Sequence, residues 1–244
     1  MKQIRVIAAL AMLGSGTALA DVTTEIEAGA GGVIPQLGVV VDLFGDSALP
    51  TASRSAHSID IGYAYGRGTD KQKLKGGDDP IVFGGEVFTA GQDLNYTINI
   101  RFAHLAYRYR HYFGETQAFG IEGLIGVGWA GLGLRARGAT QTAAESLGNA
   151  GYVLGVGGLW RFQRNTAVYL RILGLSTGAE EGVSSAGRFD LGVQYALGRH
   201  ASVNAGLGFI SAYSARENDR DSDSLKSPIN ASVGGLTLGA QLIF

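Results

Sequence analysis

The fold class is decided by the stretch INASVGGLTLGAQLIF, residues 229–244. From residue 236 onward the even positions are apolar: Leu236, Leu238, Ala240, Leu242 and Phe244. The odd positions are mostly small or polar, with Ile243 as the exception. A period of two predicts a β-strand with one apolar face. A terminal aromatic residue on that face is typical of a strand that crosses a membrane, where the ring lies at the lipid–water interface.

The same stretch carries a short motif, Thr237-x-Gly239-x-x-Leu242-x-Phe244. It resembles the C-terminal signal by which outer-membrane barrels of Gram-negative bacteria are recognised by the barrel assembly machinery. The resemblance implies that these four residues form an assembly signal. It also implies that the assembly machinery is a partner during insertion.

The start of the sequence has the features of a secretory signal peptide. Lys2 and Arg5 are positive, residues 6–13 are apolar, and Ala18-Leu19-Ala20 is a small-residue cleavage site. We therefore expect residues 1–20 to be removed before Asp21. Residues 21–244 are then expected to form a single barrel domain in the outer membrane.

The composition favours strands and turns over helices. The chain has 39 glycines, 4 prolines and no cysteine, and so much glycine would destabilise helices. The absence of cysteine excludes a disulfide framework and thiolate chemistry. A formal net charge of −1 gives no basic excess for nucleic acid. No apolar run is long enough for a transmembrane helix.

Alternating segments predict where the strands lie. Seven are expected from residue 94 onward, at 94–113, 118–137, 152–163, 167–177, 188–197, 202–213 and 229–244. Three more are expected at 23–31, 37–43 and 59–65, and residues 81–89 are a candidate for a further strand. If both termini are periplasmic, the number must be even. We therefore predict ten strands, with eight as the alternative.

The connections alternate in length. Those near 114–116, 164–165 and 198–200 are short, whereas those near 138–150, 178–187 and 216–228 are longer and polar. This is typical of a closed antiparallel transmembrane β-barrel, an all-β fold with short periplasmic turns and longer extracellular loops.

Two strands carry further detail. In residues 94–113 the apolar set moves from even to odd positions, which predicts a β-bulge near Ala103-His104. Phe119 and Trp129 share one face of the next strand. Their separation corresponds to about 25 Å of height at a strand tilt near 40°, so they are predicted to lie in the two aromatic girdles.

If the apolar faces point to lipid, the other faces line the lumen. This predicts an interior charge network: Glu25, Glu27, Arg108, Arg110, Glu122, Arg161, Arg171, Arg188 and Asp190. A three-residue turn after Phe113 would set Arg108 directly across from Glu122. Two interpretations remain: a charged pore, or a rigid salt-bridge network that plugs a narrow barrel. We favour the plug.

Metal and catalytic sites are not expected. Asp219, Asp221 and Asp223 resemble half of a calcium loop, but Ser224 and Asn230 occupy the positions where glycine and glutamate are needed. No carboxylate–histidine–serine grouping can be placed on one face. We therefore predict no enzyme, metal or cofactor. His104, at the predicted bulge, is the histidine to mutate first.

The whole chain resembles, by architecture, small Gram-negative outer-membrane β-barrels of the OmpA, OmpX and opacity-protein kind. That family implies a monomeric or loosely associated barrel whose extracellular loops differ between members and carry surface roles. We therefore predict a monomeric surface or structural protein, with outer-membrane lipid and lipopolysaccharide as partners. A narrow porin-like channel and a lipid-modifying enzyme are the alternatives. The run Lys71-x-Lys73-x-Lys75 would either meet lipopolysaccharide phosphates or be a solvated loop.

Overall fold

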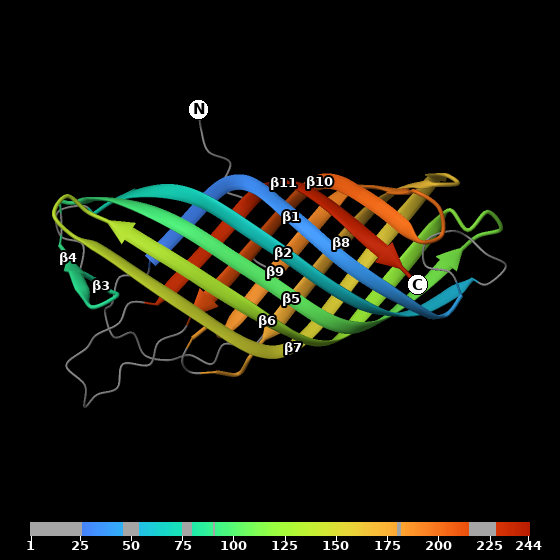
Figure 1. Cartoon of the computed structure of the whole chain (residues 1–244), viewed down its shortest axis with the longest axis horizontal. Coiled ribbons are helices and arrows are strands. Elements are labelled where there is room, and N and C mark those ends of the chain that lie inside the picture. Colours follow the sequence, from blue (N-terminus) through green and yellow to red (C-terminus); the bar gives the residue numbers. More distant parts are fainter. Residues whose placement is uncertain (1–25, 46–53, 75–79, 90, 180–181, 215–227) are drawn as a thin grey trace.

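The computed structural model describes residues 26–45, 54–74, 80–89, 91–179, 182–214 and 228–244. These residues form one closed β-barrel and a separate two-stranded hairpin (Figure 1). The barrel strands are β1 (Ile26–Phe44), β2 (Ser55–Lys73), β5 (Asp93–Phe113), β6 (Phe119–Arg137), β7 (Thr142–Gln163), β8 (Thr166–Ser176), β9 (Ser185–Ala196), β10 (Ala201–Ser214) and β11 (Ile229–Ile243). The hairpin strands are β3 (Ile81–Phe83) and β4 (Glu86–Phe88). The described residues include no helix long and apolar enough to cross a bilayer.

The strand order around the barrel is β1-β11-β10-β9-β8-β7-β6-β5-β2. All neighbours run antiparallel except β1 and β11, which pair in parallel from Ile26↔Ile229 to Val40↔Ile243. An odd number of strands requires this, because the first and last strands then point the same way. The barrel closes through the ladder between β1 and β2, which runs from Gln36↔Ala64 to Phe44↔His57.

The two ends of the barrel differ, and we name them by their connections. The turn end holds the connections 114–118, 164–165 and 197–200 and the terminal Phe244. The hairpin end holds β3 and β4 and the start of β1 (Figure 1). Phe244 is fixed at the turn end, because its N–H donates to Val40 O over 2.9 Å and its carbonyl accepts from Asp42 N over 2.7 Å.

The predicted count of ten strands, with eight as the alternative, is wrong: the described residues form a barrel of nine strands. The seven strands expected from residue 94 onward are all present. Before it, residues 26–31 and 37–43 belong to the single strand β1, and residues 81–88 form the hairpin outside the barrel sheet; residues 23–25 lie outside the described residues. Pro35 does not interrupt β1, because the ladder to β2 begins only at Gln36 and needs no N–H from the proline. The first described residue, Ile26, consequently lies at the opposite end from Phe244, so the even-number argument fails.

The predicted bulge near Ala103-His104 is also wrong. β5 pairs with β2 and β6 without any register shift, and its even positions are buried from Leu94 to Tyr112. What changes is the chemistry of the two faces. Inside, apolar residues up to Phe102 give way to polar ones from His104; outside, polar residues up to Arg101 give way to apolar ones from Leu105.

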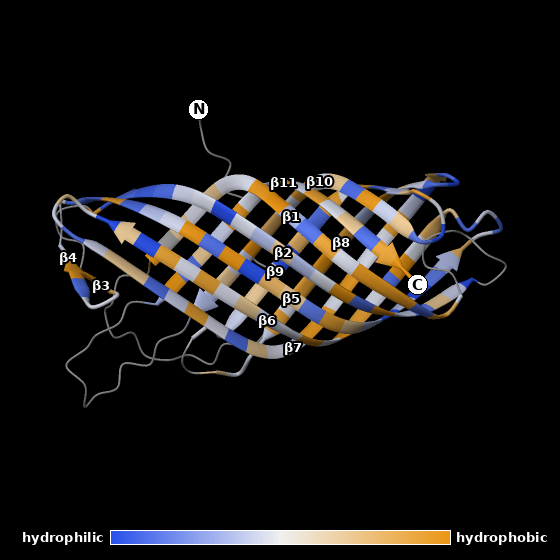
Figure 2. Ribbon diagram, in the orientation of Figure 1, coloured by the Kyte–Doolittle hydropathy of each residue, from blue (hydrophilic) through white to orange (hydrophobic). Residues whose placement is uncertain are grey.

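This inversion divides the barrel into two halves. In the hairpin half the interior is mainly apolar and the outer wall mainly polar; in the turn half the outer wall is apolar and the interior holds most of the buried charged side chains. Figure 2 shows hydrophobic and hydrophilic residues alternating along the strands. Most of the predicted long loop 138–150 is strand. β7 already begins at Thr142, which pairs with Arg137 of β6, so this part of β7 lies in the hairpin half.

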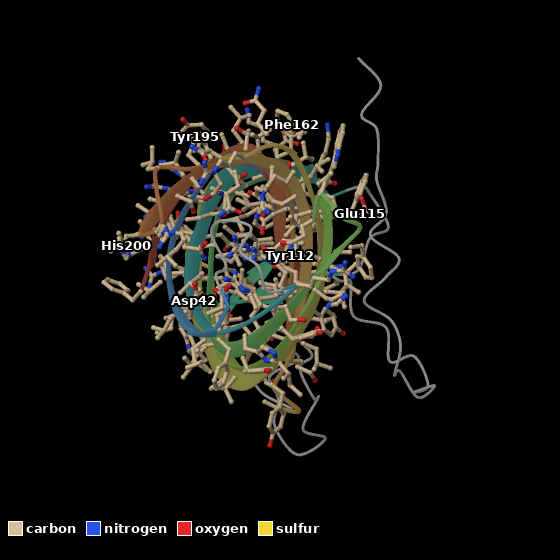
Figure 3. The ribbon with its side chains drawn as sticks, turned by 90° about the vertical axis from the view of Figure 1, so that its right-hand side faces the viewer. Asp42, Tyr112, Glu115, Phe162, Tyr195 and His200 are labelled. Atoms are coloured by element: carbon tan, nitrogen blue, oxygen red, sulfur yellow. The ribbon has the colours of Figure 1, made fainter. Side chains whose placement is uncertain are left out.

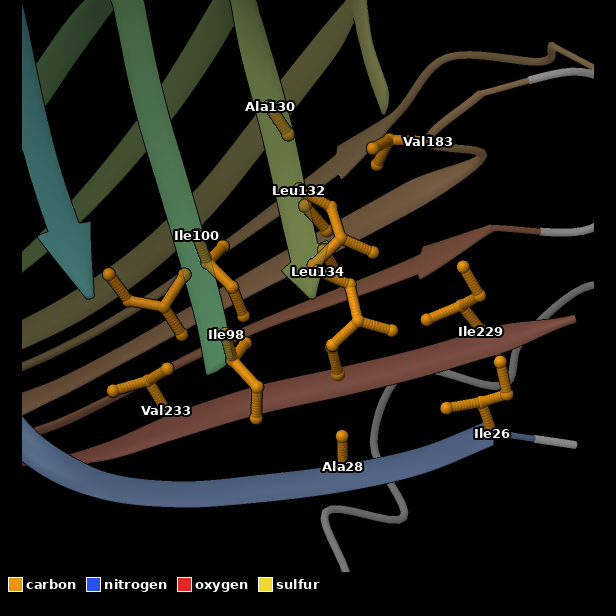
Figure 4. Close-up of a cluster of buried hydrophobic side chains, with 14 of the residues drawn as sticks. Ile26, Ala28, Ile98, Ile100, Ala130, Leu132, Leu134, Val183, Ile229 and Val233 are labelled. Carbon is orange, nitrogen blue, oxygen red and sulfur yellow. The ribbon is translucent and has the colours of Figure 1, made fainter. Parts of the chain in front are cut away.

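The hairpin half contains the hydrophobic core. Ile98, Ile100, Leu132 and Leu134 are almost fully buried and meet side chains from β1 and β11 (Figure 4). The hairpin adds Ile81, Phe83 and Phe88 to the same cluster, with exposures of 0%, 1% and 0%. This half is therefore packed like the interior of a soluble protein.

The turn half has an apolar outer wall bounded by aromatic side chains. On β6 the exposed apolar run extends from Phe119 to Trp129, and on β7 it extends from Tyr152 to Phe162. At about 3.3 Å per residue and a tilt near 40°, each run corresponds to about 25 Å along the barrel axis.

Candidate functional site: the charged lumen

The interior of the turn half is filled by polar and charged side chains. Viewed along the barrel from the turn end, these side chains occupy the ring of strands, and Tyr112 lies within it (Figure 3). They reach the lumen because successive residues of a strand point to opposite faces. Apolar residues occupy the outer positions between them.

Asp60 on β2 joins three positively charged or ionisable partners. Its Oδ2 lies 2.7 Å from Arg108 Nη1 and 3.8 Å from Arg171 Nη1, and its Oδ1 lies 3.2 Å from His104 Nε2. The carboxylate and the His104 ring are both about 2% exposed. Arg108 also donates from Nε to Ser58 Oγ over 3.2 Å.

Glu122 on β6 forms the second junction. Its Oε2 accepts from Arg110 Nη2 over 2.7 Å, and its Oε1 accepts from Arg171 Nε over 2.7 Å. Arg171 therefore links Glu122 to Asp60. Arg110 continues the network by donating to Tyr112 OH over 3.3 Å.

A third group lies on β9 and its neighbours. Arg188 Nε lies 2.7 Å from Asp190 Oδ2, and Asp190 Oδ1 accepts from Gln36 Nε2 over 2.6 Å. Asn204 donates to Gln36 Oε1 over 3.2 Å and to Tyr169 OH over 3.0 Å. These contacts tie β1, β8, β9 and β10 together across the lumen.

Inward-facing glycines provide room for the large charged groups. A Cβ at Gly62 would lie 2.2 Å from His104 Cε1, and one at Gly157 would lie 2.8 Å from Glu122 Cγ. Each glycine is the register partner of the residue it accommodates, so His104 and Glu122 can lie flat against the neighbouring strand. A narrow lumen can therefore be filled completely.

Most of the predicted lumen residues take part in the three groups of contacts described above. Arg108, Arg110, Glu122, Arg188 and Asp190 are buried, and Arg171 is 16% exposed. Arg161 lies apart from the carboxylates, with its Cζ 5.1 Å from the centroid of the Tyr112 ring. Glu25, and the side chain of Glu27, lie outside the described residues. The apolar face beside them, with Ile26 and Ala28, points inward rather than outward, because this end of β1 belongs to the hairpin half.

The predicted pairing of Arg108 with Glu122 is wrong by two residues. The connection after Phe113 has five residues, 114–118, and Phe113 pairs with Phe119. Arg110 therefore lies opposite Glu122, and Arg108 reaches across to Asp60 on the other neighbouring strand.

Sequence reasoning missed the partners on β1, β2 and β10: Gln36, Ser58, Asp60 and Asn204. The signal was available for Asp60, because Ile59 and Ile61 beside it mark the outer face. Ser58, Asp60 and His104 do share one face, contrary to expectation. All three groups are buried, and Ser58 Oγ accepts a hydrogen bond from Arg108 Nε.

The other predicted residues lie on β6 and β11. Phe119 and Trp129 both face outward, with exposures of 59% and 36%. Leu242 and Phe244 also face outward, whereas Thr237 is fully buried and Gly239 faces the interior beside Asn204 and Gln36.

Small cavities lie among the charged side chains of the turn half. One of about 50 Å³ is lined by Asp60, His104, Arg171 and Asp190 among others, and one of about 20 Å³ is lined by Arg110 and Arg161 among others. Cavities of this size hold a few water molecules. In the described ranges, no group of three or more histidine and carboxylate side chains is placed to hold a metal ion.

Comparison of the chain with protein-family models, with curated proteins and with solved structures gives no match.

Proposed function

We propose that the protein is an integral outer-membrane β-barrel with a closed lumen, acting as a structural and surface protein and not as a pore. The turn half would lie in the bilayer, with Phe244 on the periplasmic side. The hairpin half would project from the outer surface as a solid barrel, and would present its outer wall and its connections to the surroundings.

The outer wall of the turn half supports the membrane position. Large apolar side chains are exposed on all nine strands, for example Leu37, Ile61, Leu105 and Leu207 at 66%, 44%, 48% and 58%. In water such a surface would be costly, since monomeric soluble proteins rarely expose apolar patches above a few hundred Å². The aromatic residues that bound it and its height of about 25 Å match the apolar band of membrane barrels.

The filled interior carries the proposal that the lumen is closed. An ion entering from the turn end would meet the Asp60–Arg171–Glu122 network, in which every charge already has a partner. Beyond it lies the apolar core of the hairpin half, capped by Phe83 and Phe88. Two barriers in series favour a structural role over the channel alternative. The burial of Ser58 and His104 disfavours the enzyme alternative.

Planar-bilayer recording tests this proposal. Wild type is expected to show no steady single-channel current, and Glu122→Ala should also stay closed because the apolar core remains in place. Glu115→Ala, an exposed residue in the 114–118 connection, is the matched control. Vesicle flotation must first show that each protein has inserted. A steady pore in inserted wild type would overturn the closed-lumen proposal.

A further inference from the structure

The outer wall of the hairpin half carries one strongly charged surface, which we name the basic face. It consists of exposed lysine and arginine side chains on three adjacent strands: Arg67, Lys71 and Lys73 of β2, Arg101 of β5, and Arg135 and Arg137 of β6. Among the described residues of these strands, the only acidic side chain on this wall is Asp93, opposite Lys73 at the tip. None of the six basic residues forms an ion pair within the part of the chain that the structure describes.

The register arranges the basic face as a trough. Its floor is β5, with the short polar side chains Asn95, Thr97 and Asn99. Asn95 lies between Lys71 and Arg137, since it is the register partner of both. Cross-strand partners lie about 5 Å apart, so the two basic side chains flank the floor from either side.

The position of the trough is set by the apolar band below it. On β2 the outward residue Tyr65 is followed by Arg67, and on β5 Arg101 is the register partner of Tyr65. On β6 the outward glycines 131 and 133 separate Trp129 from Arg135. With the strand rise and tilt used above, the basic side chains begin about 5 Å above the aromatic residues and extend to about 20 Å above them.

The rest of the hairpin half is not charged in this way. The outward positions of β8 to β11 there carry glycine, serine and other uncharged residues, such as Ser176, Gly187, Ser211 and Ser232. The charge is therefore concentrated on one side of the barrel and faces sideways, directly above the apolar wall. A ligand held there would lie beside the barrel at head-group height, which favours a membrane lipid over a soluble polyanion.

We propose that the basic face binds the phosphorylated head group of a lipid in the outer leaflet, with the phosphates of lipid A as the ligand chemistry. The inference rests on the proposed membrane position of the turn half. Arginine and lysine are the usual partners of phosphate, and arginine can bind it in a bidentate manner. The amide and hydroxyl groups on the floor supply further hydrogen bonds. Acyl chains of the same lipid would contact the apolar wall below.

Lipid binding in nanodiscs tests the inference. The full chain is reconstituted in phosphatidylcholine, and binding of bis-phosphorylated lipid A is compared with binding of the dephosphorylated form. Wild type is expected to prefer the phosphorylated form. The triple variant Arg67→Gln/Arg101→Gln/Arg135→Gln should weaken that binding by about tenfold or more, because each basic side chain near a lipid phosphate contributes several-fold. The matched control is Arg54→Gln/Arg164→Gln/Arg199→Gln, the same change at exposed turn-end residues. It should bind within about twofold of wild type.

The outcomes distinguish a failure of the lipid-binding inference from a failure of the proposed function. If the protein inserts but the triple variant binds lipid A like the control, the basic face is not a lipid site and the proposed function stands. If wild type does not insert into vesicles at all, both proposals are overturned. If the basic face binds soluble heparin while lipid A binding does not depend on the phosphates, its partner is a soluble polyanion and the inference is wrong.

Discussion

Asp60 is the residue on which the lumen network depends most, since it contacts Arg108, Arg171 and His104 from one buried carboxylate. A buried ion pair stabilises a protein little compared with an apolar replacement of both partners, but removal of one partner is costly. Without Asp60, Arg108 would be a fully buried cation whose nearest remaining contact is the neutral hydroxyl of Ser58.

We therefore expect Asp60→Asn to lower the free energy of unfolding in lipid vesicles by about 3–5 kcal/mol. Urea titration followed by tryptophan fluorescence measures the change. Asp93→Asn removes the same charge from an exposed position and should stay within about 0.5 kcal/mol of wild type. Equal effects of the two substitutions would show that the buried network does not hold the barrel together.

For single residues, the sequence predicts which side chains face the lumen better than it predicts which of them contact one another. Alternation was sufficient to assign Arg108, Arg110, Glu122, Arg171, Arg188 and Asp190 to one face. The partner of each was not predictable, because it depends on the length of a connection: five residues after Phe113 instead of three moved Arg110 opposite Glu122. Across-lumen contacts such as Gln36 with Asp190 join residues 154 positions apart and leave no local signal.

Among the elements, β1 departs furthest from expectation. It changes partners along its length: residues 26–40 pair with β11 in parallel, and residues from Gln36 onward pair with β2. β1 and β11 approach closely at Gly32 and Gly235, where a Cβ on Gly235 would lie 1.7 Å from the carbonyl oxygen of Gly32. Glycine is required at that crossing. The sequence showed two alternating segments here, but the pairing that joins them into one strand is non-local.

Disulfide cross-linking tests the parallel closure. Val33 and Leu236 are register partners that both face outward, and the chain has no cysteine of its own. Val33→Cys/Leu236→Cys should therefore cross-link under mild oxidation, since paired strands bring Cα atoms within disulfide range.

Val33→Cys/Leu242→Cys is the control for this experiment. Its two positions lie six residues apart along the seam, about 20 Å, and should stay reduced. Cross-linking of the control pair alone would exclude this register.

The whole molecule combines two kinds of barrel in one sheet. The same nine strands enclose an apolar core at the hairpin end and a charged network at the turn end. Their outer wall is polar around the apolar core and apolar around the charged network. The sequence contained this inversion in residues 94–113, where the apolar set changes from even to odd positions. The same pattern also predicts a bulge, because alternation alone cannot distinguish a strand with an extra residue from a regular strand that passes from one environment to another.

The predicted assembly signal is tested on the whole chain, because its last residue, Phe244, hydrogen-bonds across the seam between β11 and β1. Deletion of Phe244 is expected to reduce insertion in cells several-fold while changing the unfolding free energy of already folded protein by about 1 kcal/mol. Outer-membrane yield and urea titration measure the two effects separately. Normal insertion without Phe244 would contradict an addressing role.

The most direct test of the membrane position is a depth scan along the outer face of β6. Single cysteines at Ile121, Ile125, Val127, Arg135 and Arg137 are labelled with a nitroxide in vesicles, and collision rates with oxygen and with a water-soluble nickel complex are measured. The first three positions should collide mainly with oxygen, as lipid-facing sites do, and the last two mainly with the nickel complex. High accessibility to the nickel complex at all five positions would contradict a barrel whose turn half lies in the membrane.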